Sequence, residues 1–366
     1  SNSVIITSSG FAEIGEIELQ ECIKSIGKEI GVRLLGPNCM GVYNPHERLD
    51  TFFLPHERLK RPKKGNVAVV SQSGAILSCL ISTIRESNLG VSKAIGYGNA
   101  IDINESDLYE YLSDDEQTEI VVSYIEAVID GRRFIDSAKV LSRRKPFILL
   151  KSGKGPSGQA AAYSHTGRLA GRYEVFNSIL RQFRIREARD FDELIDATKA
   201  MSFQCNVCKS NIKDKPLNKV LIMTNGGGSG VLAVDECMRI GLDVAPLPEE
   251  KAKRLEEMFP YFYGINNPVD LTAQVKDEDY ITVLKEMKDD YDGFVLIALS
   301  NVFGITERLS GLIGDAILDL DINKPIVFHI PKNGVARALI SDLEKIKIPV
   351  YPSPERAVRA LKSILG

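Results

Sequence analysis

The stretch Val67-Ala68-Val69-Val70-Ser71-Gln72-Ser73-Gly74-Ala75 decides the fold of this 366-residue chain. Its four apolar residues are typical of a buried strand, and the hydroxyls and glycine after them are typical of a turn that leads into a helix. A strand without polar alternation indicates a parallel sheet that is covered by helices on both faces. The sequence therefore predicts an α/β fold.

Similar apolar runs, alternating with amphipathic helical stretches, lie on both sides of this stretch. The predicted strands are 4–7, 32–35, 67–70, 91–95, 119–124, 146–150, 220–223, 242–245, 294–298, 326–330 and 350–351. The predicted helices span 16–30 and 354–365, and others begin near Gly74, Asn104, Arg132 and Gly167. This order of elements predicts doubly wound parallel sheets.

The chain is expected to have three parts. Residues 1–62 hold too few elements for a domain and are interpreted as the second half of an open α/β domain. The chain starts at Ser1-Asn2, which suggests a tag remnant or a missing N-terminal segment. Residues 65–203 and 217–366 each have enough strands for a flavodoxin-like domain, and a polar stretch links them.

Composition excludes several classes of protein. The net charge of -3 argues against nucleic acid as a partner, and no apolar run approaches the ~20 residues of a membrane span. Six scattered cysteines without a secretory signal predict a reduced, cytoplasmic setting. The CxxC pair Cys205 and Cys208 has no second pair nearby, so no metal site is predicted.

Two turns are candidate phosphate sites, because ligands of open α/β sheets bind beyond the carboxyl ends of the strands. In the turn of Ser71, Gln72, Ser73 and Gly74, backbone N–H groups at a helix start can cradle an anion, although a capped turn explains the same residues. The second turn has more glycine, which is expected where a ligand comes close. It consists of Asn225, Gly226, Gly227, Gly228, Ser229 and Gly230.

His165 is the candidate nucleophile. It is one of only four histidines and lies in the small-residue run Ser164-His165-Thr166-Gly167. A neutral imidazole attacks phosphorus near pH 7, since its ordinary pKa is about 6.5. Glu126 ends the strand 119–124 and can orient that imidazole. Taken singly, a helix-start histidine and a solvated strand-end glutamate explain these residues as well.

Taken together, the motifs resemble the NDP-forming acyl-CoA synthetases, the superfamily of succinyl-CoA synthetase, and most closely the α subunit of ADP-forming acetyl-CoA synthetase. The motifs occur in the family's order along nearly the whole chain. They are Ile6-Thr7-Ser8-Ser9-Gly10-Phe11-Ala12-Glu13, Gly36-Pro37-Asn38-Cys39-Met40-Gly41, Ser71-Gln72-Ser73-Gly74, Gly98-Asn99, Glu126, Ser164-His165-Thr166-Gly167, Asn225-Gly226-Gly227-Gly228, Asn267-Pro268-Val269-Asp270 and Asn301-Val302-Phe303-Gly304.

The resemblance implies a role for each motif. His165 is phosphorylated during turnover, Glu126 holds it, and the helix starts after Ser71 and Gly226 converge on the phosphoryl group. Residues 1–62 become the C-terminal part of a Rossmann-like CoA-binding domain, 65–203 the ligase domain with the phosphohistidine, and 217–366 a flavodoxin-like third domain. Gly10, Phe11 and Asn38 then contact CoA.

The implied reaction is acyl-CoA + ADP + phosphate to acid + CoA + ATP, through an acyl phosphate. In this family ADP is phosphorylated on an ATP-grasp module with Mg²⁺, so the resemblance implies an ATP-grasp β subunit or domain as partner. The assembly is then a hetero-oligomer, or a dimer of fused chains. The acyl group is not identified by the sequence.

Two departures and two alternatives accompany this hypothesis. The first half of the CoA-binding domain is missing, and Arg168 stands where the family carries a small residue, so that it either adds a cation or faces solvent. One alternative is a non-catalytic, ligase-like regulatory module, as fused to protein acetyltransferases. The other, a dinucleotide-dependent oxidoreductase, lacks a GxGxxG turn after a strand.

Overall fold

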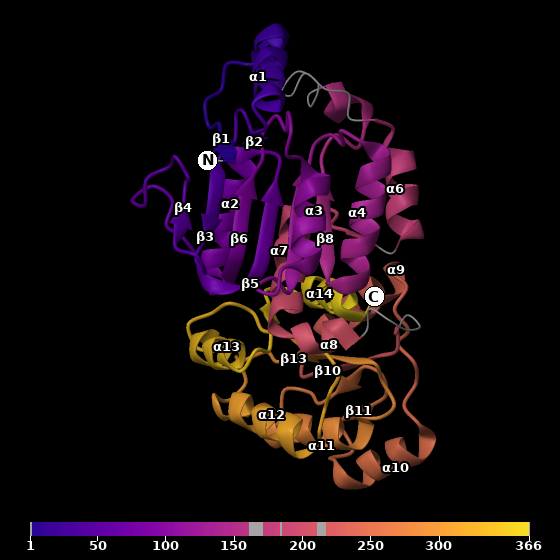
Figure 1. Cartoon of the computed structure of the whole chain (residues 1–366). Coiled ribbons are helices and arrows are strands. Elements are labelled where there is room, and N and C mark those ends of the chain that lie inside the picture. Colours follow the sequence, from indigo (N-terminus) through magenta and orange to yellow (C-terminus); the bar gives the residue numbers. More distant parts are fainter. Residues whose placement is uncertain (1, 161–170, 184, 211–216, 366) are drawn as a thin grey trace. The chain divides into compact units, whose positions relative to one another are not determined.

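The structure is a computed structural model that describes residues 2–160, 171–183, 185–210 and 217–365 (Figure 1). The chain divides into two compact units, Ser1–Thr198 and Lys199–Gly366, which are described one at a time. Each unit holds a mostly parallel sheet flanked by helices, so the predicted α/β class is confirmed. None of the helices in the described ranges combines the length and apolar character needed to cross a membrane.

The first unit opens with a small βαβ arrangement. Strand β1 (Ser3–Ile5) pairs in parallel with β2 (Arg33–Leu35), and the chain between them forms η1 (Ala12–Ile14) and helix α1 (Ile17–Glu29). These elements confirm the strands and the helix predicted between residues 4 and 35, except that β1 ends at Ile5.

The main sheet of the first unit has the strand order β4-β3-β6-β5-β7-β8-β9. Its strands are β3 (Gly41–Asn44), β4 (Leu49–Asp50), β5 (Lys63–Ser71), β6 (Gly90–Gly96), β7 (Ile120–Ile125), β8 (Phe147–Lys151) and β9 (Arg186–Glu187). The strands β6-β5-β7-β8-β9 run parallel. Numbered along the chain, their order is the flavodoxin-type 2-1-3-4-5. It reverses between β5 and β7, and such a reversal opens a crevice beyond the carboxyl ends of those two strands.

Helices cover both faces of this sheet. They are α2 (Gly74–Glu86), α3 (Glu105–Asp114), α4 (Gly131–Arg144), α6 (Tyr173–Gln182) and α7 (Phe191–Phe203). Ala68 and Val70 of β5 belong to one core cluster with side chains of α3, α4 and α6. Val67 and Val69 point to the other face and are also fully buried. The unbroken apolar run of β5 is therefore explained by burial on both faces.

Sequence patterns do not predict β3 and β4. Strand β3 pairs antiparallel with β6 and with β4, so the sheet is mixed rather than wholly parallel. Both strands are short and carry no apolar run, so periodicity provides no signal for them. Residues of the predicted first part, 1–62, thus form the edge of the sheet whose other strands belong to the predicted second part. The boundary between these parts stays a prediction.

The second unit holds a sheet with the order β11-β12-β10-β13-β14-β15. Its strands are β10 (Val220–Thr224), β11 (Gly264–Ile265), β12 (Val269–Asp270), β13 (Gly293–Ile297), β14 (Ile326–His329) and β15 (Val350–Tyr351). Strand β11 runs antiparallel to β12, and the other strands are parallel. The parallel strands again have the order 2-1-3-4-5, with the reversal between β10 and β13.

The helices of this unit enclose a second apolar core. They are α8 (Cys205–Ser210), α9 (Gly227–Arg239), α10 (Glu249–Met258), α11 (Asp277–Met287), α12 (Arg308–Asp319), α13 (Ala336–Lys345) and α14 (Pro354–Leu365). Helix α14 confirms the predicted closing helix. The predicted polar link after residue 203 instead begins with α8, in which Cys205 is buried.

One predicted strand is wrong. Residues 242–245 form only a single bridge, between Lys219 and Asp243, and β12 lies beside β10 in their place. The side chain of Asn267 explains the exchange. Its Oδ1 accepts from the N–H of Ile222 at 3.1 Å, and its Nδ2 donates to the carbonyls of Val220 at 2.8 Å and Ala245 at 2.9 Å. The Asn267 amide thus makes hydrogen bonds to β10 that the backbone of a neighbouring strand would otherwise make.

Candidate functional site

The turn after β5 begins helix α2 with a side-chain cap. The Ser71 hydroxyl donates to the carbonyl of Ser73 at 2.7 Å, and the Ser73 hydroxyl accepts from the N–H of Ile76 at 3.4 Å. The first N–H groups of a helix have no intrahelical partner and carry a partial positive charge. Both interpretations of Ser71 to Gly74 are therefore compatible with the geometry: the turn is capped, and its helix start can still bind an anion.

Gln72 links this turn to Glu126 across the crevice between β5 and β7. Its Oε1 accepts from the backbone N–H of Glu126 at 2.8 Å and from that of Ala127 at 3.0 Å, and its own N–H donates to Tyr124 at 3.1 Å. Glu126 is 8% exposed, so it is not a solvated strand-end glutamate. The structure thus brings together the two predicted elements of the first unit, the turn and Glu126.

Lys151 lies beside Glu126 at the carboxyl end of β8, and sequence reasoning missed it. Its Nζ donates to the backbone carbonyls of Glu126 at 2.6 Å and of Ser152. Burial lowers the pKa of Lys151 to about 8, although the nearby carboxylates of Glu126 and Glu187 act in the opposite direction. A signal was present: a lysine ends the apolar strand Phe147–Lys151 at the edge of the sheet where ligands bind.

His165 and Arg168 lie outside the described residues, which leave out 161–170. The residues on either side of that range are close together. The Nε2 group of Gln159 donates to the carbonyl of Gly171 at 3.3 Å, and α6 starts soon afterwards at Tyr173. In the sequence, His165 lies between β8 and α6.

The residues predicted to bind CoA gather around the carboxylate of Glu13. Glu13 Oε1 accepts from the N–H of Gly10 at 2.6 Å and of Phe11 at 3.1 Å, and Oε2 accepts from Nδ2 of Asn99 at 2.6 Å. Asn38 donates to Asn99 at 3.3 Å. Partial burial raises the pKa of Glu13, but these hydrogen bonds outweigh it, and the pKa is lowered. The N–H groups of Gly10 and Phe11 thus already have an internal acceptor.

The glycine-rich turn of the second unit begins helix α9 without a side-chain cap. A Cβ on Gly226 would lie 2.4 Å from Cδ1 of Leu299, whereas a Cβ on Gly228 would meet nothing within 4 Å. A side chain at position 226 would therefore force Leu299 to shift, whereas one at position 228 would enter open space. The N–H groups of Ser229 and Gly230 donate to the Gly226 carbonyl at 3.0 and 3.2 Å. The two helix starts, of α2 and α9, belong to different units.

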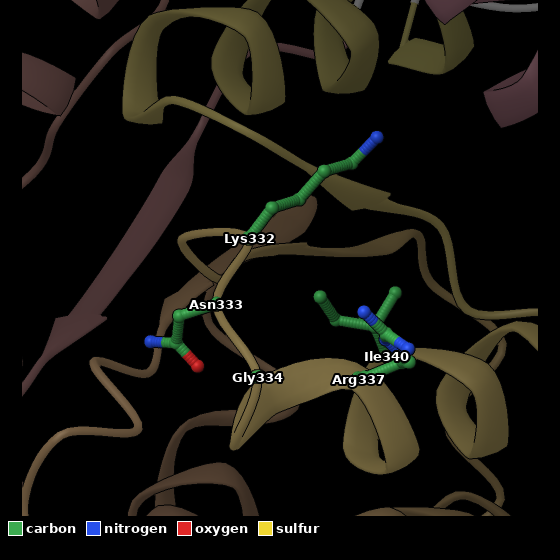
Figure 2. Close-up of a pocket in the computed structure, with 5 residues that line it drawn as sticks. All are labelled: Lys332, Asn333, Gly334, Arg337 and Ile340. Atoms are coloured by element: carbon green, nitrogen blue, oxygen red, sulfur yellow. The ribbon is translucent and has the colours of Figure 1, made fainter.

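A cavity of about 400 Å³ lies at the carboxyl end of β14 in the second unit (Figure 2). It is lined by Lys332, Asn333, Gly334, Arg337 and Ile340. Figure 2 shows Lys332 extending away from the loop that leads into α13, with Arg337 on the first turn of that helix. The Oδ1 atom of Asn333 accepts from the N–H of Ala336, the first residue of that helix, at 2.8 Å. Two cationic side chains therefore line this cavity.

Within the part of the chain that the structure describes, no three His, Cys, Asp or Glu side chains are placed to hold a metal ion.

Comparisons with known proteins identify the domains and the family of this chain. Residues 64–201 match the succinyl-CoA ligase like flavodoxin domain, and residues 220–352 match the ligase-CoA domain. The α subunit of ADP-forming acetate–CoA ligase II of Pyrococcus furiosus is 35% identical over 373 residues, a match that covers 99% of this chain and 78% of the relative. The chain belongs to the α-subunit-like family of ADP-forming acetyl-CoA synthetases.

Further relatives of this synthetase family differ in how much of their own length the match covers. The ADP-forming acetate–CoA ligase of Methanocaldococcus jannaschii is 35% identical, and the match covers 98% of this chain but 50% of the relative. A dinucleotide-forming acetyl-coenzyme A synthetase 1 of Ca. Korarchaeum cryptofilum, solved in complex with phosphate and ADP, has a TM-score of 0.88 at 30% identity. That match covers 99% of this chain and 76% of the solved one. The resemblance inferred from the motifs is confirmed.

Proposed function

We propose that this chain is the α part of an ADP-forming acyl-CoA synthetase, which converts acyl-CoA, ADP and phosphate into the acid, CoA and ATP. Phosphate attacks the thioester carbonyl and expels CoA, which gives an acyl phosphate. His165 then takes the phosphoryl group and releases the acid, and the phosphohistidine passes the phosphoryl group to ADP. Family membership supports this reaction, because the relatives are ADP-forming acid–CoA ligases.

The observation that carries the proposal is the clamp between Gln72 and Glu126. It holds the backbone of Glu126, a buried residue, where the sheet order reverses, which is where open α/β sheets bind ligands. A carboxylate there can accept a hydrogen bond from an imidazole and stabilise its charged form. In the sequence, His165 lies between β8, the strand next to β7, and α6.

The other roles follow the same proposal. The helix starts after Ser71 and Gly226 stabilise the anionic phosphoryl group through their N–H groups and partial positive charge. Residues 1–62 form the closing part of a Rossmann-like CoA-binding domain, with Gly10, Phe11 and Asn38 toward CoA as a substrate. Because Glu13 accepts from the N–H groups of Gly10 and Phe11, CoA would reach these two residues through their side-chain or Cα faces, or by displacing Glu13.

The remaining parts lie on a partner. An ATP-grasp β subunit or domain supplies the nucleotide site, and Mg²⁺ accompanies ADP or ATP there. Two relatives are named as α subunits, which supports a hetero-oligomer. The relative that this chain covers by half supports a dimer of fused chains as the other arrangement.

Phosphate labelling tests the proposal. The chain is mixed with an ATP-grasp partner, Mg²⁺ and labelled ATP, and the protein is assayed for phosphate that is labile to acid and stable to base. We expect label on the wild-type chain, none on His165→Asn, and slower labelling of Glu126→Gln. A matched control is Glu174→Gln, which changes a glutamate in the first turn of α6. No label on the wild-type chain, with CoA esters still bound, would favour the regulatory module.

A further inference from the structure

Lys151 is buried to an unusual degree for a lysine. It is 3% exposed, although lysines are almost never fully buried unless paired. Within the described residues its ammonium group makes no ion pair, and both of its hydrogen bonds go to backbone carbonyls, of Glu126 and Ser152. Removing a charge from water is costly. The position of Lys151 therefore calls for an explanation beyond packing.

Glu126 is held from both sides of its peptide backbone. Its N–H donates to Gln72 Oε1 at 2.8 Å, from the turn after β5. Its carbonyl accepts from Lys151 Nζ at 2.6 Å, from the end of β8. Because Glu126 directly follows β7, these hydrogen bonds link the carboxyl ends of the three neighbouring strands β5, β7 and β8. Together these two bonds fix the Cα of Glu126, and with it the origin of the carboxylate side chain.

We propose that Lys151 is a positioning residue of this site, whose ammonium group holds the Glu126 carbonyl and so fixes where the Glu126 carboxylate lies. The proposal rests on the proposed function for the reaction that Glu126 serves. The contact itself, with its burial, is independent of that function. Among the described residues Lys151 donates to the Glu126 carbonyl, so its proposed effect is exerted through Glu126.

Charged groups around Lys151 make this role sensitive to pH. Its surroundings include the carboxylates of Glu126 and Glu187 and the ammonium of Lys154, with the Phe176 ring of α6 centred 5.9 Å from Nζ. Burial brings the pKa of Lys151 down to about 8. Below that pH the group is an ammonium that donates charge-assisted hydrogen bonds, and above it a neutral amine that donates weaker ones. Glu126 is therefore expected to be held less firmly in position as pH rises through about 8.

The test compares Lys151→Met, Lys151→Arg and the control Lys154→Met in the full chain with its ATP-grasp partner. Lys154 is a cation near the same strand end that pairs with Glu187 at 2.8 Å. The rate of protein labelling from ATP is measured between pH 6.5 and 9.5, and thermal unfolding shows that each variant is folded. We expect the wild-type rate to fall across pH 8. For Lys151→Met we expect labelling slower by about tenfold or more, without that inflection.

The conservative variant separates positioning from a merely structural role. Lys151→Arg keeps a cation that does not titrate in this range, so we expect labelling near the wild-type rate below pH 8 and no fall above it. Lys154→Met is expected to keep an inflection, moved to higher pH because a cation that lowers the pKa of Lys151 has been removed. Wild-type rate and pH profile in Lys151→Met would overturn the proposal.

A crystal structure of Lys151→Met gives a readout that does not depend on the reaction. We expect the Glu126 carbonyl and carboxylate to be displaced relative to wild type, while the Gln72 turn stays in place. If the wild-type chain takes no label, the proposed function fails, and the displacement alone decides the positioning role. An unmoved Glu126 would overturn it.

Discussion

Gln72 and Asn225 occupy equivalent positions in the two sheets. Each directly follows the first strand of its flavodoxin-type order. Each uses its side-chain amide to hydrogen-bond the backbone that follows the neighbouring strand, at the point where the strand order reverses. Gln72 accepts from the N–H groups of Glu126 and Ala127, and Asn225 exchanges two bonds with the backbone of Leu299, at 2.8 and 3.1 Å. Both side chains are buried. The same device thus shapes the ligand edge of both sheets.

Gln72→Ala tests that device in the first unit. It leaves two buried N–H groups without their acceptor, so we expect a loss of about 2 kcal/mol in the free energy of unfolding and slower labelling of the chain. Urea unfolding followed by circular dichroism measures the first effect, and phosphate incorporation the second. Gln274→Ala, at an exposed glutamine, is the control and should change neither. Unchanged stability in Gln72→Ala would show that the clamp contributes nothing.

The glycines of the second turn offer a matched pair. Gly226→Ala places a Cβ 2.4 Å from Leu299, so we expect it to destabilise the protein by about 1 kcal/mol. Gly228→Ala enters open space at the start of α9 and should be neutral or stabilise by up to about 1 kcal/mol. If the turn contacts the phosphoryl group, Gly228→Ala slows labelling in spite of its stability. Denaturant unfolding and labelling of both variants separate packing from ligand contact.

His329 makes the stability of the second unit depend on pH. Burial lowers the pKa of this imidazole below 6.5, and its Nδ1 lies 3.1 Å from the carbonyl of Tyr351. Because the folded pKa lies below the unfolded one, the unfolded state takes up the proton first as pH falls. Stability is therefore full above about pH 6.5 and is lost toward lower pH, by at most about 1.4 kcal/mol per pH unit.

Thermal unfolding at pH 7.5 and pH 5.5 checks this prediction. We expect His329→Asn, which keeps a donor for Tyr351, to lose less stability on acidification than the wild type. His56→Gln, at an exposed histidine, should behave like the wild type. Equal acid sensitivity of wild type and His329→Asn would mean that other groups account for the pH dependence.

The cysteines should react in an order set by burial. Cys22 and Cys79 are exposed, whereas burial raises the pKa of Cys39 to about 11 and that of Cys237 to about 12. Since the thiolate is the reactive form, iodoacetamide at pH 8 should modify Cys22 and Cys79 first. Peptide mass spectrometry after short exposure measures this order. Modification of Cys39 or Cys237 before the exposed pair would contradict their burial in solution.

Much of the fold could be predicted from the sequence because strands buried on both faces leave unbroken apolar runs. The strands β5, β7, β8, β10, β13 and β14 were visible in this way. The short strands β3, β4, β11 and β12, which lie at one end of each sheet, were not, because two to four residues show neither an apolar run nor clear alternation. Their pairing depends on contacts between distant segments.

The candidate site, too, could be predicted from the sequence only in part. Glu126 could be identified because it directly follows a visible strand, and the position of a residue along a strand predicts the edge it reaches. The role of Gln72 as an acceptor for Glu126 could not, since it depends on a contact across 54 residues of chain. Lys151 also ends a visible strand. Its burial, however, is a property of the packed sheet that no local pattern encodes.

Asn267 provides the sharpest test of how this edge of the second sheet is held. Its amide makes three bonds to the backbone, one as acceptor and two as donor. Asn267→Ala removes the partner of the Ile222 N–H and one donor to the Val220 carbonyl, whereas the Ala245 carbonyl keeps the Tyr291 hydroxyl at 3.1 Å, so we expect a loss of about 2 kcal/mol in the free energy of unfolding. Asn267→Asp keeps the acceptor but turns a negative charge toward two carbonyl oxygens, so it should be at least as damaging. The neighbour Asn266 is exposed, and Asn266→Ala should unfold at the same urea concentration as the wild type. If Asn267→Asp proves as stable as wild type, the carbonyls of Val220 and Ala245 must be satisfied in another way, and the amide does not hold β12 in place of the predicted strand.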